Sequence, residues 1–185
     1  TFYVPGSSRS LARRMEEWRA AARRGHELGN HSIFHPCLKT NLKGAVRAWL
    51  KPEQELERYT VARMVAELSA MNTTLLAVDG KSSRSYAYNC SDHLAGGESF
   101  VDALRPLFPA ARTGEDRVIA DPKTVDLHFV PSWMVSKPSG EDLIAFVKDA
   151  MKTGGLAVIM FHGVGGGHNI DTSREAHQAL VAWLS

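Results

Sequence analysis

The sequence predicts an α/β fold built around a largely parallel sheet. Short apolar runs alternate along the chain with longer segments whose apolar residues recur at helical spacing, which is the pattern of βαβ units. The chain has 185 residues, of which 44% are hydrophobic, and this is enough for one sizeable core. We therefore expect a single domain over residues 1–185.

The first half of the chain predicts strands and helices in alternation. Leu11, Met15 and Trp18 recur at about 3.6-residue spacing, so an amphipathic helix is expected over residues 9–24, with its arginines facing solvent. Pro52 falls in the first turn of a second expected helix, over residues 52–71. Strands are expected at residues 2–4, 27–31 and 86–88.

The second half continues the alternation. Its clearest helix is expected over residues 139–152, because Ser139 can cap it, acidic residues fall in its first turn, and Gly154 follows its end. The continuous apolar run 156–161 predicts a strand that is buried on both faces. Further helices are expected at residues 99–108 and 173–184, and further strands at residues 110–112 and 125–130.

Charge and hydropathy argue against two kinds of partner. The 22 basic and 20 acidic residues give a formal net charge of +2, and the early arginines fit a solvated helix face, so we expect no nucleic-acid partner. No stretch approaches the roughly 18 to 20 apolar residues of a membrane span, and none reads as a signal peptide. Because the chain opens on Thr1 instead of methionine, we expect it to be trimmed at its N-terminus. Charge and hydropathy do not indicate whether the chain is a monomer or an oligomer.

The segment Gly29–Pro36 places two histidines directly after a short extended run. His31 and His35 are four residues apart, so both rings can reach one ion, and Pro36 disfavours the α conformation at His35 and keeps the pair in a turn. Neutral imidazole suits zinc, cobalt or nickel. The segment therefore predicts half of a metal site, and the alternative is a chance pair of surface histidines.

The two cysteines each lie beside a segment of interest. Cys37 follows the histidine pair, and Cys90 follows the aromatic segment that begins at Tyr86. A disulfide between them requires Cα atoms within roughly 4.4 to 6.8 Å of each other. Spacing alone leaves a disulfide and two buried free thiols equally open.

His162 ends the last expected strand and is followed by a glycine-rich loop. Functional groups of parallel α/β folds gather at the carboxyl ends of the strands, so His162 is a candidate general acid or base. The alternative is a structural histidine bonded to a backbone carbonyl. The loop lacks the Lys-Ser/Thr pair of a phosphate loop, and His168 stands where a dinucleotide-binding loop needs its third glycine, which argues against a nucleotide.

Several motifs together resemble the polysaccharide deacetylases of carbohydrate esterase family 4, which carry the NodB homology domain. They are HSIFHP after GHELGN, then RSYAYNC, AARTG, and VIMFHGVGG followed by SREAHQAL. The resemblance implies a distorted (β/α) barrel. It also implies a divalent metal, usually zinc, and hydrolysis of N- or O-acetyl groups on chitin, peptidoglycan or a related glycan. It further implies a secreted, periplasmic or cell-surface protein.

The resemblance also assigns roles to individual residues. His31 and His35 match the metal-binding histidines, and His162 matches the histidine that protonates the leaving amine. Trp133 would form an aromatic wall of the substrate groove, and Tyr88 of the aromatic strand is a second candidate for binding substrate. For Trp133, a partly buried packing role is equally open.

Two family features are missing from the chain. The TFDDG-like segment, which supplies the third ligand and the general base, belongs before the strand at Thr1, and the arginine that tethers the base is not evident. Asp79, Asp92 and Asp126 are the nearest replacements by context, but turn or surface roles are more typical of such residues. A barrel without its N-terminal strand has unpaired edges, so we expect the isolated chain to be unstable or oligomeric. A hydrolase of another non-peptide C–N bond and a non-catalytic carbohydrate-binding relative are the alternatives.

Overall fold

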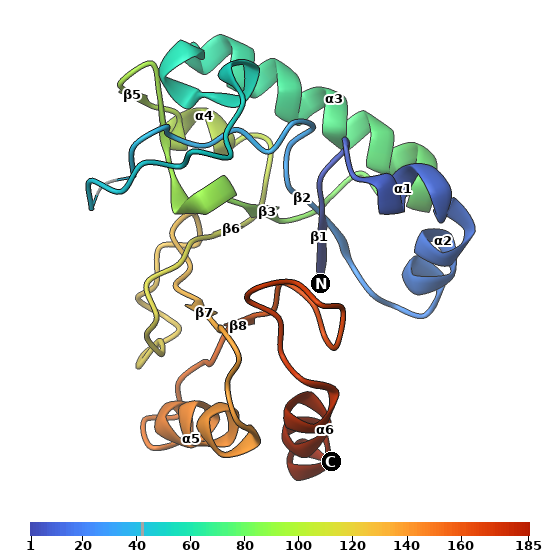
Figure 1. Ribbon diagram of the computed structural model, residues 1–185, viewed down its shortest axis with the longest axis vertical. Helices are drawn as coiled ribbons and strands as arrows, with labels where there is room; N and C mark the ends of the chain where they lie inside the picture. The colour runs from blue at the N-terminus through green and yellow to red at the C-terminus, as the bar shows by residue number, and fades with distance from the viewer. Residues whose placement is uncertain (42) are drawn as a thin grey trace. The chain divides into compact units, whose positions relative to one another are not determined.

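The computed structural model describes residues 1–41 and 43–185 and divides into two compact units, Thr1–Arg112 and Thr113–Ser185. Both units are mixed α/β and contain parallel strands (Figure 1). The expected single domain over residues 1–185 stays a prediction beside this division.

The first unit is organised around a parallel sheet of four strands, which are, in their order across the sheet, β1 (Phe2–Val4), β2 (Leu28–Asn30), β3 (Tyr86–Ala87) and β6 (Ala111–Arg112). A Cβ atom at Gly29 would lie 2.5 Å from Tyr3 Cδ1, so the Tyr3 ring of the neighbouring strand occupies the space that a side chain at Gly29 would need. Among the described residues no sheet is closed, and the barrel stays a prediction.

The helices of the first unit depart from the expected limits. The expected helix 9–24 is broken at Arg14, whose φ of −129° and ψ of 40° are not helical. The expected helix 52–71 begins only at Val61, because the Thr60 side chain accepts a hydrogen bond from Arg63 N and caps it there. The helices are α1 (Arg9–Arg13), α2 (Met15–Arg23), η1 (Pro52–Gln54), η2 (Leu56–Arg58), α3 (Val61–Asp79), η3 (Asn89–Ser91) and α4 (Val101–Leu104), and an antiparallel pair is formed by β4 (Leu94–Ala95) and β5 (Glu98–Ser99).

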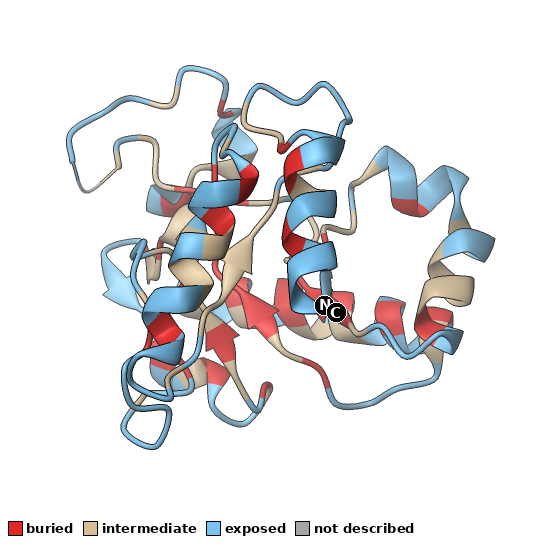
Figure 2. Cartoon of the chain, turned by 90° about the horizontal axis from the view of Figure 1, so that it is seen from below, coloured by how far each residue is buried: buried red, intermediate tan, exposed pale blue. Residues whose placement is uncertain are grey.

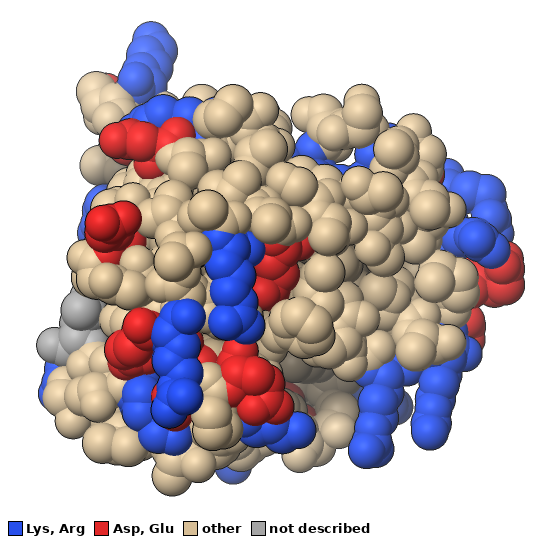
Figure 3. All heavy atoms as spheres, turned by 90° about the horizontal axis from the view of Figure 1, so that it is seen from above, with Lys and Arg blue, Asp and Glu red and all other residues tan. Residues whose placement is uncertain are grey.

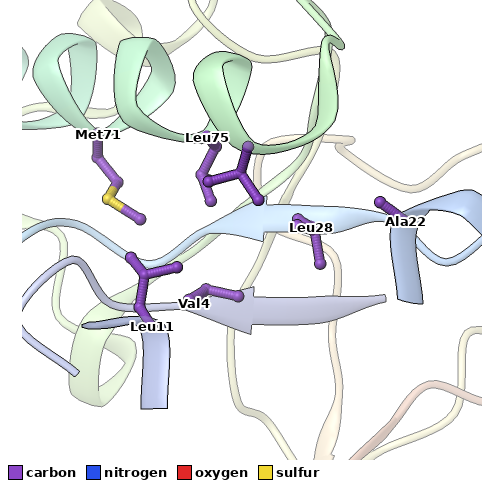
Figure 4. Close-up of a cluster of buried hydrophobic side chains, with 7 residues drawn as sticks. Val4, Leu11, Ala22, Leu28, Met71 and Leu75 are labelled. Atoms are coloured by element: carbon purple, nitrogen blue, oxygen red, sulfur yellow. The ribbon is translucent and has the colours of Figure 1, made fainter. Parts of the chain in front are cut away.

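Helix α3 covers the sheet of the first unit and supplies much of its core. Met71 and Leu75 lie one turn apart and point from α3 toward Val4 and Leu28 of the strands (Figure 4). All four side chains are almost fully buried, and burial of one such side chain stabilises a fold by about 1.5–3 kcal/mol. The rest of this cluster comes from Leu11, Ala22 and Val78.

The second unit pairs two short parallel strands with two helices. Strands β7 (Trp133–Met134) and β8 (Ile159–Met160) pair in parallel, and helices α5 (Gly140–Met151) and α6 (Arg174–Leu184) pack through Leu143, Ala176 and Leu180. The expected helix at 139–152 is confirmed, with Ser139 and Asp142 forming a capping box. Buried residues follow one side of the helices in both units (Figure 2).

Two expectations for this second unit are wrong. Residues 125–130 form turns instead of a strand, because the Asp126 carboxylate accepts a hydrogen bond from His128 N at 2.9 Å and folds the backbone locally. The run 156–161 is not buried on both faces: Leu156 is 43% exposed, and the residues of β8 are half-buried.

The surface charges are mixed. Arg19 pairs with Glu16 at 2.6 Å on the exposed side of α2, and Arg14 pairs with Glu17 at 3.0 Å. Basic side chains are interspersed with acidic ones on the face shown in Figure 3. Among the helices that the structure describes, none has the length and hydropathy of a membrane-spanning segment.

The neighbouring leucines Leu75 and Leu76 provide a matched test of the α3 packing. Leu75 is fully buried and Leu76 is 44% exposed. We expect Leu75→Ala to lower the free energy of unfolding by about 2–5 kcal/mol, because it leaves a cavity in the core. Leu76→Ala should cost less than about 1 kcal/mol. Urea unfolding of both variants measures the difference, and equal losses would contradict this packing.

Candidate metal-binding site

The candidate site begins where β2 ends, at Asn30. This side chain is fully buried, and its amide nitrogen donates to Leu68 O at 2.9 Å and to Asn72 Oδ1 at 2.7 Å. Its Oδ1 accepts a hydrogen bond from Ser32 N at 2.8 Å. Asn30 therefore ties the following turn to α3, and Ser32 there has a φ of 59°.

A buried carboxylate holds the middle of this turn. Glu67 of α3 is 8% exposed, and its Oε1 accepts hydrogen bonds from Ile33 N at 3.0 Å and Phe34 N at 2.9 Å. Its Oε2 accepts from the Tyr59 hydroxyl at 2.9 Å, and burial together with this carboxylate raises the pKa of Tyr59. These bonds offset the cost of burying Glu67. A signal for its role exists in the sequence, since Glu67 interrupts the apolar stripe Met64, Leu68 and Met71 of α3.

The turn brings the two predicted histidines together. The ring centroids of His31 and His35 lie 4.7 Å apart, with an interplanar angle of 83°. His31 Nδ1 lies 2.9 Å from Ala87 O. Because a carbonyl oxygen only accepts, Nδ1 carries the hydrogen and the lone pair is on Nε2. Asn89 Nδ2 lies 3.3 Å from His31 Nδ1 and 3.1 Å from His31 O. Because His31 Nδ1 already bears a hydrogen and cannot accept another, Asn89 Nδ2 donates to His31 O.

This contact of His31 is typical of metal-binding histidines. Such residues usually donate the second ring N–H to a carbonyl or carboxylate, which fixes both tautomer and ring orientation. The parallel pairing of β2 with β3 creates the contact, because it sets Asn30 opposite Tyr86 and so brings His31, the residue after β2, beside Ala87, the last residue of β3.

His35 is held in an uncommon backbone conformation. Its φ is 56°, and its N–H donates to Ser32 Oγ at 3.0 Å. Desolvation of the ring lowers the pKa of His35, and the nearby charges of Arg47 and Arg112 lower it further. The lowered pKa favours the neutral form of the ring, which is the form that binds a metal.

A disulfide lies next to the ring of His35. Cys37 and Cys90 are bonded, with Cα atoms 5.8 Å apart, which resolves the alternative that the sequence left open. Cys37 Sγ lies 3.6 Å from His35 Nδ1. The disulfide joins the segment after the histidine pair to the segment after β3, across 53 residues of sequence.

An ion pair reinforces this junction. Arg47 Nη1 donates to Asp92 Oδ2 at 2.8 Å and to Leu38 O at 2.7 Å, and Leu38 N donates to the same carboxylate oxygen at 2.8 Å. Asp92 is 3% exposed and follows the helical turn η3, so of its expected turn or surface role the surface position is wrong. Burial raises the pKa of Asp92, against the opposing effects of its hydrogen bonds and of Arg47.

The carboxylates suggested by the sequence have other partners. Asp79 forms a buried ion pair with Arg84 at 3.2 Å and accepts a hydrogen bond from Lys81 N at 2.9 Å, so of its expected turn or surface role the turn is confirmed and the surface position is wrong. Asp126 belongs to the second unit, where it caps the turn described above. Within the described ranges 1–41 and 43–185, no carboxylate joins His31 and His35 in a cluster of three potential ligands. Two imidazoles fit zinc as part of a ligand set that needs further donors.

The other predicted site residues take the following positions. Tyr88 is 1% exposed and packs against Tyr86 and Phe100 at ring-centroid distances of 5.1 and 5.9 Å. Its substrate-binding role stays a prediction, which this burial disfavours. Trp133 is half-buried against Phe146, with ring centroids 4.8 Å apart, and its role also stays a prediction.

His162 lies in the second unit, after β8. It is exposed, and its ring stacks on that of His168 with centroids 5.8 Å apart and an interplanar angle of 13°. Exposure suits a group that exchanges protons, and the general-acid role stays a prediction.

Trp49 is an aromatic residue of the site that the sequence reasoning missed. Its ring centroid lies 6.4 Å from that of His35, and the side chain is 60% exposed. A large exposed aromatic side chain beside polar groups is typical of a binding surface.

Comparison with family models, curated proteins and solved structures finds no match to this chain.

The pKa of His35 gives a test of its environment. We expect its ring to titrate below 6.5, the ordinary value, because desolvation disfavours the charged form. The unfolded chain then binds this proton more readily, so the contribution of His35 to stability is complete above pH 6.5 and is lost as the pH falls below it. NMR titration of the ring measures the midpoint, and His35→Gln should remove this part of the pH dependence of urea unfolding. A midpoint at or above 6.5 would contradict the assignment.

Proposed function

We propose that the chain is a metal-dependent hydrolase that removes N- or O-acetyl groups from a polysaccharide, with His31 and His35 as metal ligands. The observation that carries the proposal is the histidine pair itself, with ring centroids 4.7 Å apart and the His31 tautomer set by the bond to Ala87 O. The acetylated substrate rests on the resemblance of the motifs around these residues to those of polysaccharide deacetylases.

The proposed chemistry divides between the metal and the protein. Zinc, or cobalt or nickel in its place, would polarise the acetyl carbonyl and lower the pKa of a bound water to about 7. His31 orients its Nε2 through the Ala87 contact, and desolvation of the His35 ring lowers its pKa and so favours the neutral form. His162 would donate the proton that the leaving amine or alkoxide takes up.

The proposal also needs a carboxylate ligand and a carboxylate base. In the family that the motifs resemble, both come from a TFDDG-like segment, so the activity is best tested in a polypeptide that contains such a segment as well as in this chain. A secreted, periplasmic or cell-surface location is part of the same proposal, and the Cys37–Cys90 disulfide supports an oxidising compartment.

A non-catalytic carbohydrate-binding domain is the second candidate. The exposed Trp49 ring favours it, because tryptophan presents an apolar face on which a sugar ring can stack. In this alternative the site would bind acetylated glycans without releasing acetate. A hydrolase of another non-peptide C–N bond has no separate observation in its favour.

Metal content is the first test of the proposal. We expect about one zinc per chain after dialysis against zinc, and loss of this metal in the His31→Ala, His35→Ala double variant, because both donors are removed. His26→Ala, which changes an exposed histidine elsewhere in the first unit, should keep the metal. Elemental analysis of the three proteins measures the difference.

Acetate release from acetylated glucosamine oligomers is the second readout of the same proteins. Metal and acetate release that are both lost in the double variant support the hydrolase. Metal and oligomer binding without acetate release, even when a TFDDG-like segment is present, would support the binding domain. Absence of metal from the wild-type protein would contradict both the site and the proposed activity.

A further inference from the structure

The disulfide beside His35 contains the atoms of a second set of metal ligands. His35 Nδ1 and the two sulfur atoms of Cys37 and Cys90 all lie within 4.8 Å of one another. In a tetrahedral zinc site with Zn–S bonds of about 2.3 Å and Zn–N bonds of about 2.0 Å, neighbouring nitrogen and sulfur ligands are roughly 3.6 Å apart. The separation of His35 Nδ1 from Cys37 Sγ is 3.6 Å, so these two atoms already have the spacing of ligands to one ion.

We propose that reduction of the Cys37–Cys90 disulfide converts this cluster into a binding site for a thiophilic metal ion such as zinc, cadmium or copper(I), with His35 Nδ1 as the third ligand. In the oxidised protein the sulfur atoms are bonded to each other and offer no thiolate to an ion. The oxidation state of the disulfide would therefore decide whether the site exists. This inference does not rest on the proposed hydrolase activity.

The surrounding bonds keep the two cysteine segments together without the disulfide. Asp92, two residues after Cys90, accepts hydrogen bonds from Leu38 N and from Arg47, each at 2.8 Å. Cys37 is also fixed by its own backbone, since its N–H donates to Gln54 O at 3.0 Å and its carbonyl accepts from Leu56 N at 2.9 Å. The two thiols formed on reduction would therefore stay close enough to share an ion.

The chemistry of the conversion balances with a dithiol as reductant. The dithiol supplies two electrons and two protons, the bond between the two sulfur atoms of the protein breaks to give two thiols, and the dithiol becomes a disulfide. Metal binding then releases both thiol protons to solvent, because the thiolate is the ligand form. Two thiolates and a neutral imidazole compensate the charge of a divalent ion, and a solvent ligand can complete the tetrahedron.

The two ligand sets share one residue. In the reduced protein, His35 Nδ1 would bind the ion together with the two cysteine thiolates. In the histidine pair, the ring of His35 would instead bind an ion together with His31 Nε2. Soft thiolates select zinc, cadmium and copper(I), and the histidine pair supplies nitrogen alone. A cobalt(II) ion distinguishes the two sets, because thiolate ligation adds an intense near-ultraviolet charge-transfer band.

Cobalt titration of the whole chain tests the inference. The protein is reduced with a dithiol, desalted without oxygen, checked for two free thiols and for an unchanged far-ultraviolet circular dichroism spectrum, and titrated with cobalt(II). We expect a charge-transfer band that saturates at about one cobalt per chain, and no such band from the oxidised protein. Cys37→Ser and Cys90→Ser should each abolish the saturating band.

Histidine variants separate this site from the histidine pair. His35→Ala should weaken cobalt binding to the reduced protein by at least about 10-fold, because loss of a direct ligand should cost no less than the loss of an outer-shell partner. His31→Ala should keep the charge-transfer band of the reduced protein. His26→Ala, the control at an exposed histidine, should keep it as well. Three results would overturn the inference: no band with two free thiols present, equal binding by His35→Ala and the wild type, or loss of the folded spectrum on reduction. Failure of the proposed function is distinct, because it appears as missing metal in the oxidised protein.

Discussion

The buried carboxylate of Glu67 is the constraint on which the candidate site depends. It accepts hydrogen bonds from two consecutive N–H groups of the turn, those of Ile33 and Phe34, and from the Tyr59 hydroxyl. The turn contains two residues with positive φ, Ser32 and His35, a conformation that costs energy for residues other than glycine. Glu67 and Asn30 offset this cost by tying the turn to α3, and the helix in turn packs on the sheet through its buried stripe.

The parallel sheet then determines what the histidine pair can do. Pairing of β2 with β3 places Ala87 O within hydrogen-bond distance of His31, and this contact selects the tautomer with its lone pair on Nε2. The disulfide and the Arg47–Asp92 ion pair hold the opposite side of the site, next to His35. The candidate site is thus preorganised by elements that are distant in sequence, as the proposed metal binding by a short turn would require.

Local signals in the sequence predict part of this arrangement. The limits of α5 follow from Ser139 and the acidic residues after it, and the closeness of His31 and His35 follows from their spacing. The start of α3 is harder to predict from the sequence, because Pro52 and Thr60 are both typical of a helix start. Pro52 begins the short helix η1, and Thr60 caps α3.

Tertiary partners explain what the sequence does not predict. Glu67 stands out in the sequence only as a charged residue within the apolar stripe of α3, and its partners in the turn become evident only in the folded chain. Asp92 gives no such signal, because its partner Arg47 lies 45 residues away in the sequence. The disulfide likewise depends on the approach of two segments that lie 53 residues apart in the sequence. The spacing of the two cysteines therefore does not show whether they are bonded. X-ray absorption at the zinc edge of the oxidised, zinc-loaded protein tests the histidine pair most directly. We expect imidazole nitrogen at about 2.0–2.1 Å from zinc and no sulfur neighbour. Sulfur at about 2.3 Å, or a first shell without imidazole, would contradict it.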